Sequence, residues 1–328
     1  MKALITGITG FVGSHLAEYL LAEVPGIEIS GLKRWRSPKD NIAQLLDRIT
    51  LHDGDLRDLA SLVTVLSKAR PDLIFHLAAQ SYVPTSFLAP ADTLETNVVG
   101  TANLLEAVRM AKLDPVIHIC SSSEVYGQVT EKDLPIREDC PLRPVSPYAV
   151  SKVGEDMLGL MYWKAHGLRT LRTRMFTHSG ARRGEVFVDS FLAMQVARIE
   201  KGQQPPVLRV GNLDSVRTFC DVRDTVRAYW MLTQKCPPGE IYNIGGVATM
   251  SIRDMVKLLL GLSPAGPKIE VRVDPELLRP ADVTLQIPCT DKFRAATGWE
   301  PRIPYQDTLA DMLNYWRARV SQTPPEGR

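Results

Sequence analysis

Tyr148 and Lys152 are the two residues whose types and spacing point most directly to chemistry. They fall in a predicted helix over residues 148–164, where side chains four positions apart lie one above the other on the same face. A lysine ammonium in that position favours the ionised form of a phenol, so we expect Lys152 to lower the pKa of Tyr148. The pair therefore predicts a base that works near neutral pH on an alcohol.

A second candidate acid or base, Glu124, follows a predicted strand over residues 116–120. Ser122 and Ser123 precede it and would bring hydroxyl groups into the same cleft. Two proton-transfer groups in one cleft can do more than oxidise an alcohol, which favours a sugar-modifying enzyme over a simple dehydrogenase. The alternative for Glu124 is a strand-end carboxylate that pairs with an arginine.

A glycine-rich turn lies between a predicted strand over residues 3–6 and a predicted helix over 12–21. Glycines allow the backbone to approach a pyrophosphate, and the helix N-terminus supplies amide donors and positive potential. The alternative, a turn that needs glycine only for its shape, does not account for the strand-turn-helix context. The residues expected to contact a dinucleotide here are Gly7, Thr9, Gly10, Phe11, Val12 and Gly13.

A basic run, residues 33–36, follows the predicted second strand over 27–32. Enzymes that use NAD place an acidic residue there to bind the ribose 2′-hydroxyl. Arg34 and Arg36 instead suit a 2′-phosphate, because guanidinium groups bind phosphate in a bidentate manner. We therefore predict NADP rather than NAD, the alternative being a solvated basic loop.

Two further loops are expected at the cofactor, because each follows a strand at the carboxyl edge of the predicted sheet. One follows residues 48–52 and the other residues 73–77. The cofactor-binding residues predicted in these loops are Asp55, Leu56, Leu77, Ala78, Ala79 and Gln80.

The elements that must position these residues alternate between strand and helix through residue 175. This alternation predicts an α/β fold, a Rossmann doubly wound parallel sheet, with a helix over 93–110 leading into the strand that precedes Glu124. We predict a cofactor-binding domain over 1–175, completed by about 215–245. A smaller C-terminal substrate-binding domain would take 176–214 and 246–320, with helices over 251–260 and 305–320 and a tail over 321–328.

Composition narrows the class of protein. The 328 residues carry a formal net charge of +2, which gives no support for nucleic-acid binding. No apolar run is long enough to span a membrane, and the first strand begins at the N-terminus without a signal segment, so we expect a cytoplasmic protein. Five cysteines without CxxC spacing predict free thiols and no metal site.

Together these motifs resemble the extended short-chain dehydrogenase/reductase, or NAD-dependent epimerase/dehydratase, superfamily. The resemblance rests on the glycine turn, the run from His76 to Gln80, the run from Asn97 to Asn103, the Ser-Ser-Ser-Glu-Val-Tyr-Gly segment and the Tyr148/Lys152 pair. Within the superfamily the chain looks like the GDP-mannose 4,6-dehydratase branch. That narrower match is carried by residues 31–34, 182–188, 210–217, 278–282 and 297–301.

The resemblance implies roles for the catalytic residues. Tyr148 would take the proton of the C4 hydroxyl while C4 gives its hydride to NADP, and Lys152 would bind the nicotinamide ribose. Glu124 would remove the C5 proton and protonate the departing C6 hydroxyl, and the hydride would return to C6. Ser122 would hydrogen-bond the C4 oxygen, with Ser123 beside it.

The resemblance also implies binding residues. His178 would lie near the nicotinamide, and Arg183, like Arg182, would contact a phosphate of the cofactor or substrate. The residues expected to bind a GDP-sugar are Ser81, Ser86, Glu124, Thr177, Val188, Asn212, Arg217, Arg279 and Asp282.

Three points stay open at this stage. Thr177 stands where these dehydratases commonly have Asn, and its surroundings look closer to a sub-branch that acts on GDP-manno-heptose. The second reaction class is an NADPH-dependent reductase of GDP-4-keto-6-deoxymannose, which shares the Tyr/Lys pair; the broader alternative is another nucleotide-sugar epimerase or dehydratase. Family members form homodimers or homotetramers, and we expect either here.

Overall fold

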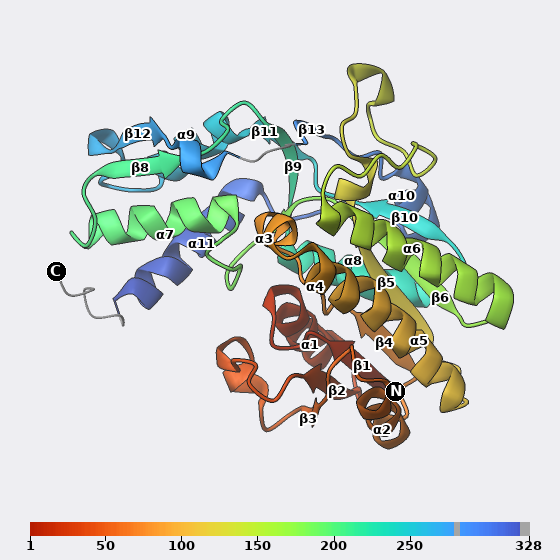
Figure 1. Ribbon diagram of the computed structural model, residues 1–328. Coiled ribbons are helices and arrows are strands. Elements are labelled where there is room, and N and C mark those ends of the chain that lie inside the picture. The colour runs from red at the N-terminus through yellow and green to blue at the C-terminus, as the bar shows by residue number, and fades with distance from the viewer. Residues whose placement is uncertain (279–282, 322–328) are drawn as a thin grey trace.

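The computed structural model describes residues 1–278 and 283–321 and centres on a seven-stranded parallel sheet. The strand order is β10-β6-β5-β4-β1-β2-β3, so the chain starts in the middle, winds to one edge and returns to the other (Figure 1). This confirms the predicted doubly wound sheet. The strands are β1 (Lys2–Thr6), β2 (Glu28–Lys33), β3 (Thr50–Asp53), β4 (Leu73–His76), β5 (Val116–Ser122), β6 (Thr170–Met175) and β10 (Ile241–Ile244).

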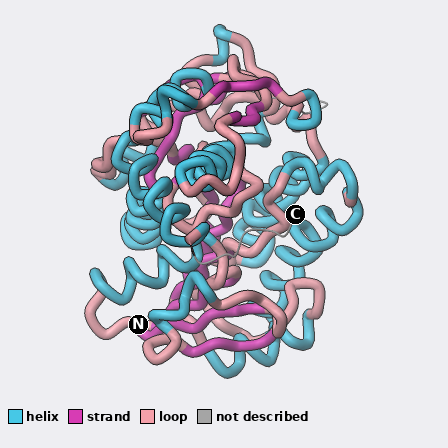
Figure 2. Tube along the Cα trace, turned by 90° about the vertical axis from the view of Figure 1, so that its left-hand side faces the viewer, coloured by secondary structure: helices cyan, strands magenta, loops and turns pink. Residues whose placement is uncertain are grey.

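Helices cover both faces of this sheet (Figure 2). Side chains alternate between the faces of a strand, so Ile5 of β1 packs in one apolar core and Leu4 in the other. The core around Ile5 takes in residues of α1 (Phe11–Glu23), α8 (Val222–Lys235) and α10 (Asp291–Thr297). The core around Leu4 takes in residues of α2 (Leu59–Ala69), α5 (Gly100–Met110) and α6 (Pro147–His166).

The predicted helix over 93–110 is interrupted in its first half. Its N-terminal part is α4 (Pro90–Leu94), followed by a π-helical turn over Glu95–Val99 before α5 begins. The side chain of Asn97 in this turn donates to the carbonyl of Gln80 at 3.0 Å and to the hydroxyl of Ser151 at 2.8 Å. A π turn inserts a residue into the helix, and here that residue ties the loop after β4 to helix α6.

The chain after β6 builds a second part beside the carboxyl edge of the sheet. A four-stranded sheet contains β11-β9-β13 with β7 on β9, and a two-stranded sheet pairs β12 with β8. Helices α7, α9 and α11 share one apolar core with β8, β9 and β11. Their bounds are β7 (His178–Ser179), β8 (Val207–Val210), β9 (Val216–Asp221), β11 (Ala248–Ser251), β12 (Glu270–Val273), β13 (Leu285–Gln286), α7 (Val188–Glu200), α9 (Ile252–Gly261) and α11 (Tyr305–Val320). The remaining helix, α3 (Val83–Leu88), lies next to α4 and α6.

The predicted segment over about 215–245, expected to complete the cofactor-binding domain, is divided between the two sheets. Helix α8 and strand β10 return to the central sheet, whereas β9, which begins at Val216, belongs to the smaller sheet. The division of the chain into two domains stays a prediction. Within residues 1–278 and 283–321, no helix is both long enough and apolar enough to cross a membrane.

Candidate active site

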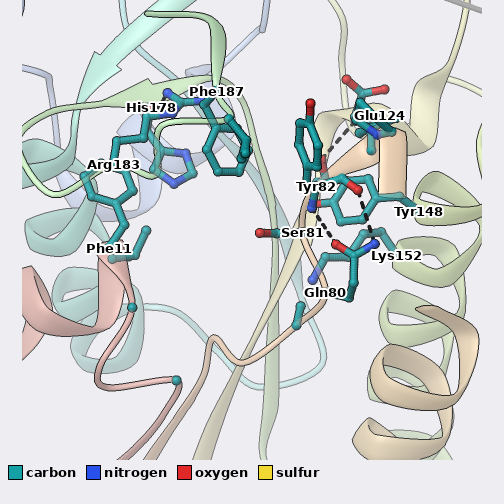
Figure 3. Close-up of a pocket in the computed structure, with 18 of the residues that line it drawn as sticks. Phe11, Gln80, Ser81, Tyr82, Glu124, Tyr148, Lys152, His178, Arg183 and Phe187 are labelled. Atoms are coloured by element: carbon teal, nitrogen blue, oxygen red, sulfur yellow. Dashed lines mark hydrogen bonds between the residues drawn. The ribbon is translucent and has the colours of Figure 1, made fainter. Parts of the chain in front are cut away.

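One cavity of about 1340 Å³ runs along the carboxyl edge of the central sheet and continues between the sheet and the second part of the chain. It is larger than the 300–1,000 Å³ typical of a site for one small ligand, so it has room for a dinucleotide and a second ligand together. Figure 3 shows its two walls, with His178, Arg183 and Phe187 on one side and Gln80, Glu124, Tyr148 and Lys152 on the other.

The glycine-rich turn fits a dinucleotide. Gly7 has a φ of +71°, a conformation that residues with a Cβ rarely adopt. A Cβ on Gly13 would lie only 2.3 Å from the carbonyl oxygen of Gly7, so only glycine lets the first turn of α1 sit this close to the loop. The N-terminus of α1 then faces the cavity, and no side chain of the described residues caps it, which is the arrangement that binds a pyrophosphate.

The basic run after β2 divides into residues with different surroundings. Lys33 is paired with Asp53 at the end of β3. Arg34 lines the cavity together with Ser37. Arg36 does not line it, and its guanidinium instead lies 5.0 Å from the ring centre of the exposed Trp35. Of the two arginines predicted to bind a 2′-phosphate, the structure therefore brings only Arg34 to the cavity.

Tyr148 and Lys152 lie on the buried face of α6, as their spacing predicts, with the Lys152 ammonium 5.9 Å from the centre of the Tyr148 ring. Burial raises the pKa of Tyr148 to about 12. The Lys152 charge and a hydrogen bond with Ser122 lower it only in part. Lys152 thus lowers the pKa of Tyr148 as expected, and burial acts in the opposite direction and outweighs it.

Glu124 and its serine neighbours stand where β5 passes into a short 3-10 helix, Ser123–Tyr126. The hydroxyl of Ser122 accepts from the amide of Glu124 at 3.2 Å and so caps this helix. The cap fixes the backbone of Glu124 beside Tyr148 in the cavity wall (Figure 3). Ser123 is buried and donates its hydroxyl to Gln286 at 2.8 Å, so it joins the short helix after β5 to β13.

His178 forms part of the opposite wall. Its ring stacks on that of Phe11 with centroids 5.8 Å apart, and its Nδ1 lies 3.1 Å from the carbonyl of Phe176. Burial lowers the pKa of His178 to about 4, so the imidazole is neutral at physiological pH. A neutral aromatic pair in this place suits a flat heterocycle better than it suits an anion.

Comparison with known proteins agrees with this geometry. The family model described as GDP-mannose 4,6 dehydratase matches residues 4–312. The chain belongs to this family.

Two curated relatives carry different names within it. GDP-6-deoxy-D-mannose reductase of Pseudomonas aeruginosa is 34% identical over 322 residues, which is 98% of this chain and 99% of the relative. GDP-mannose 4,6-dehydratase of Yersinia enterocolitica is 34% identical over 354 aligned positions, covering 95% of this chain and 92% of the relative.

Two solved structures show the same fold with a nicotinamide cofactor. RMD from Pseudomonas aeruginosa, complexed with NADPH, has a TM-score of 0.84 and 34% identity, covering 97% of this chain and 99% of that one. DesIV, a dTDP-glucose 4,6-dehydratase from Streptomyces venezuelae with NAD and TYD bound, has a TM-score of 0.86 and 28% identity, covering 98% of each chain. A nicotinamide cofactor is therefore common to these members of the wider fold.

Most residues predicted for the cofactor and substrate of such an enzyme do line the one cavity. Besides those already placed, they are Thr9, Gly10, Val12, Asp55, Leu56, Leu77, Ala78, Ala79, Gln80, Ser81, Thr177, Arg183, Val188, Asn212 and Arg217. Arg183 is held in place by Asp189 at 3.2 Å and lies over the ring of Phe187 at 4.8 Å.

Other predicted residues are not brought to the cavity. Ser86 is fully buried in α3 and donates its hydroxyl to the carbonyl of Val83 at 2.6 Å, away from the cavity lining. Arg182 forms a two-point ion pair with Glu18 of α1, so it joins the second part of the chain to the sheet domain and does not line the cavity. Arg279 and Asp282 lie outside the described residues.

Sequence reasoning missed many side chains of the cavity, among them three aromatic or charged groups at its walls. Tyr82 and Phe187 meet across it, with ring centroids 6.0 Å apart. Arg57 lines it near the basic run and pairs with Asp55 at 3.2 Å, which lowers the pKa of that carboxyl. The signal for Arg57 was its position directly after Asp55 and Leu56, whereas nothing local indicated that Tyr82 and Phe187 meet.

Proposed function

We propose that the protein is an NADP-dependent 4,6-dehydratase of a GDP-manno-sugar, either GDP-mannose or GDP-manno-heptose. The observation that carries the proposal is the position of Tyr148, Lys152 and Glu124 in the wall of one cavity with the glycine-rich turn. The first two serve alcohol oxidation, and the carboxylate is the additional group that an elimination needs.

The residues divide the proposed reaction between them. A nicotinamide cofactor held at the glycine-rich turn and beside His178 would supply the hydride acceptor for C4 of the sugar and the hydride donor for C6. Tyr148 takes the C4 hydroxyl proton, and Ser122, which hydrogen-bonds Tyr148, holds the C4 oxygen beside it. Once C4 is a ketone the C5 proton is acidic, and Glu124 removes it and passes a proton to the departing C6 hydroxyl. Glu124 thus acts as base and then as acid, and ends the reaction as it began. C5 regains a proton as the hydride returns to C6, and the proton that Tyr148 took from the C4 hydroxyl balances it.

The test is to incubate the purified protein with GDP-mannose and no added cofactor. We expect a product lighter by one water, with no net appearance of reduced nicotinamide, because the hydride returns within each turnover. No reaction with GDP-mannose but the same loss of water from GDP-manno-heptose would assign the longer sugar. Failure with both sugars would refute the dehydratase.

A reductase of GDP-4-keto-6-deoxymannose is the second candidate, favoured by the similarity to the Pseudomonas reductase along almost the whole chain. It needs Tyr148 and Lys152 but no base at C5. Stoichiometric oxidation of NADPH by the 4-keto sugar, without loss of water from GDP-mannose, would establish it.

NADP specificity is proposed from Arg34, which lines the cavity where no acidic residue ends β2. Arg34→Ala should weaken NADP binding about tenfold, equivalent to about 1.4 kcal/mol, and leave NAD binding unchanged. Isothermal titration with each dinucleotide measures both. Arg36→Ala is the matched control, because Arg36 packs on Trp35 away from the cavity, and it should bind NADP as the wild type does. Equal losses for both cofactors in Arg34→Ala would contradict a 2′-phosphate contact.

We also propose a homodimer or homotetramer. Val150, Met157 and Met161 form an exposed apolar stripe on α6, and Val99 is exposed beside the start of α5. Apolar side chains gathered on one helix face are typical of an interface. Light scattering coupled to size-exclusion chromatography would refute this by showing only a monomer.

A further inference from the structure

Glu155 is a buried carboxylate that the proposed chemistry does not use. It follows Lys152 by one helical turn on α6 and is only 1% exposed. Its Oε2 accepts from the Lys152 ammonium at 2.9 Å, and its Oε1 has no hydrogen-bond partner among the described residues. A buried carboxylate with an unpartnered oxygen is unfavourable, so its presence against a functional lysine calls for a reason.

The carboxylate and a backbone carbonyl hold Lys152 from two sides. The ammonium also donates to the carbonyl of Cys120 on β5 at 2.9 Å. These two contacts hold the Lys152 ammonium between α6 and β5. There it lies 5.9 Å from the centre of the Tyr148 ring, close enough for its charge to act on Tyr148. The negative charge of Glu155 also offsets the positive charge of Lys152, so Tyr148 experiences a weaker field than a lysine alone would give.

We propose that Glu155 is a positioning residue that holds the Lys152 ammonium in place and, through its charge, sets the pH range in which Tyr148 works as a base. This inference rests on the assignment of Tyr148 as the base in the proposed function. The step involves no new bond: Glu155 gains or loses one proton, and Tyr148 takes the substrate proton as before.

Four other titratable groups near this pair stay neutral around neutral pH. Burial lowers the pKa of His76 and that of His118 to about 3, so both rings stay neutral. Burial raises the pKa of the Cys120 thiol and of the Tyr229 phenol, so these also stay neutral. The neighbouring Asp156 is paired with Arg172 at 2.6 Å and with Arg174 at 2.8 Å, so its charge is balanced.

Glu155 differs from these groups. Burial raises its pKa to about 7, with the Lys152 charge acting in the opposite direction. The carboxylate raises the pKa of Tyr148, since a nearby negative charge opposes ionisation of a phenol. As the pH falls through about 7, Glu155 becomes neutral and this opposition is lost. In the wild type, the acid side of the pH profile should therefore be shallower than that of a single titrating group.

The test is Glu155→Gln, which keeps the shape of the side chain and removes its charge. We expect the midpoint of the acid limb of the log kcat/KM profile to move to lower pH by about one unit, so that activity between about pH 7 and the plateau rises about tenfold relative to its maximum. Well below pH 7, where Glu155 is already neutral in the wild type, the two profiles should coincide. The acid limb of the variant should also have the slope expected for a single titrating group. Glu106→Gln is the matched control, because it removes the same charge on α5, where Glu106 pairs with Arg109 near the surface. Its limb should not move.

A second readout does not depend on turnover. The phenolate absorbance of Tyr148 is obtained in NADP-loaded protein by subtracting the titration of the Tyr148→Phe variant, with and without Glu155→Gln. The midpoint should fall by the same amount as the kinetic limb. This measurement stands even if neither GDP-sugar is a substrate, so failure of the proposed function and failure of this inference are distinguishable. An unchanged midpoint, or one moved to higher pH, would overturn the role of Glu155. If Glu155→Gln does not fold, a wild-type acid limb that follows a single proton would overturn it instead.

Discussion

Replacing Tyr148 with Phe should reduce kcat by about a hundredfold to ten-thousandfold, the range for loss of one acid or base group. The substitution removes only the hydroxyl that takes the C4 proton and hydrogen-bonds Ser122. The ring is 9% exposed and stays packed on α6, so NADP affinity should change by no more than about twofold. Stopped-flow kinetics with GDP-mannose and titration with NADP measure the two quantities.

The control for Tyr148 lies on the same helix. Tyr162→Phe removes a hydroxyl that donates to Glu106 at 2.7 Å, away from the cavity, and it should keep wild-type turnover. In the wild type, kcat/KM should fall as the pH falls, because burial raises the pKa of Tyr148 and the base must be ionised to act. Tyr148→Phe should abolish this dependence on pH. Turnover by Tyr148→Phe above a tenth of the wild-type value would remove Tyr148 from its role.

Glu124→Gln should reduce loss of water by about a hundredfold or more, because the C5 proton then has no base. Oxidation at C4 does not need this carboxylate, so reduced nicotinamide should accumulate on the enzyme after GDP-mannose is added. Exchange of the C5 hydrogen with deuterated solvent should stop. Absorbance of the reduced cofactor and mass spectrometry of the recovered sugar follow the two steps separately.

The matched control for Glu124 is Glu185→Gln, which changes another carboxylate in the cavity wall. It should leave C5 exchange at the wild-type rate. Unchanged turnover by Glu124→Gln would strip Glu124 of its assigned chemistry. If the wild type reduces the 4-keto sugar and Glu124→Gln does so equally well, the reductase is the correct reading. The Glu124 variant therefore separates two enzymes that share every residue needed for hydride transfer.

Much of the fold was predictable because its signals are local. Alternating strands and helices specify a parallel sheet, since a crossover helix is what returns the chain in the same direction. Helix α7 was not predicted, because the face that it buries carries Asp189, Ser190 and Gln195 among its apolar residues. Asp189 pairs with Arg183, and Gln195 donates to the carbonyl of Arg209. Such partners offset the cost of burying these polar residues, and no pattern within the helix sequence indicates that the partners are there.

The site divides in the same way. The sequence by itself determined that Tyr148 and Lys152 share a helix face and that a glycine turn opens α1, because both depend on spacing within one segment. Tertiary structure decided the contact between Tyr82 and Phe187, the removal of Ser86 from the cavity, and the ionisation of Tyr148. Ionisation depends on burial and on every charge within reach, Glu155 included. These are properties of packed neighbours, and only the folded chain brings such neighbours together.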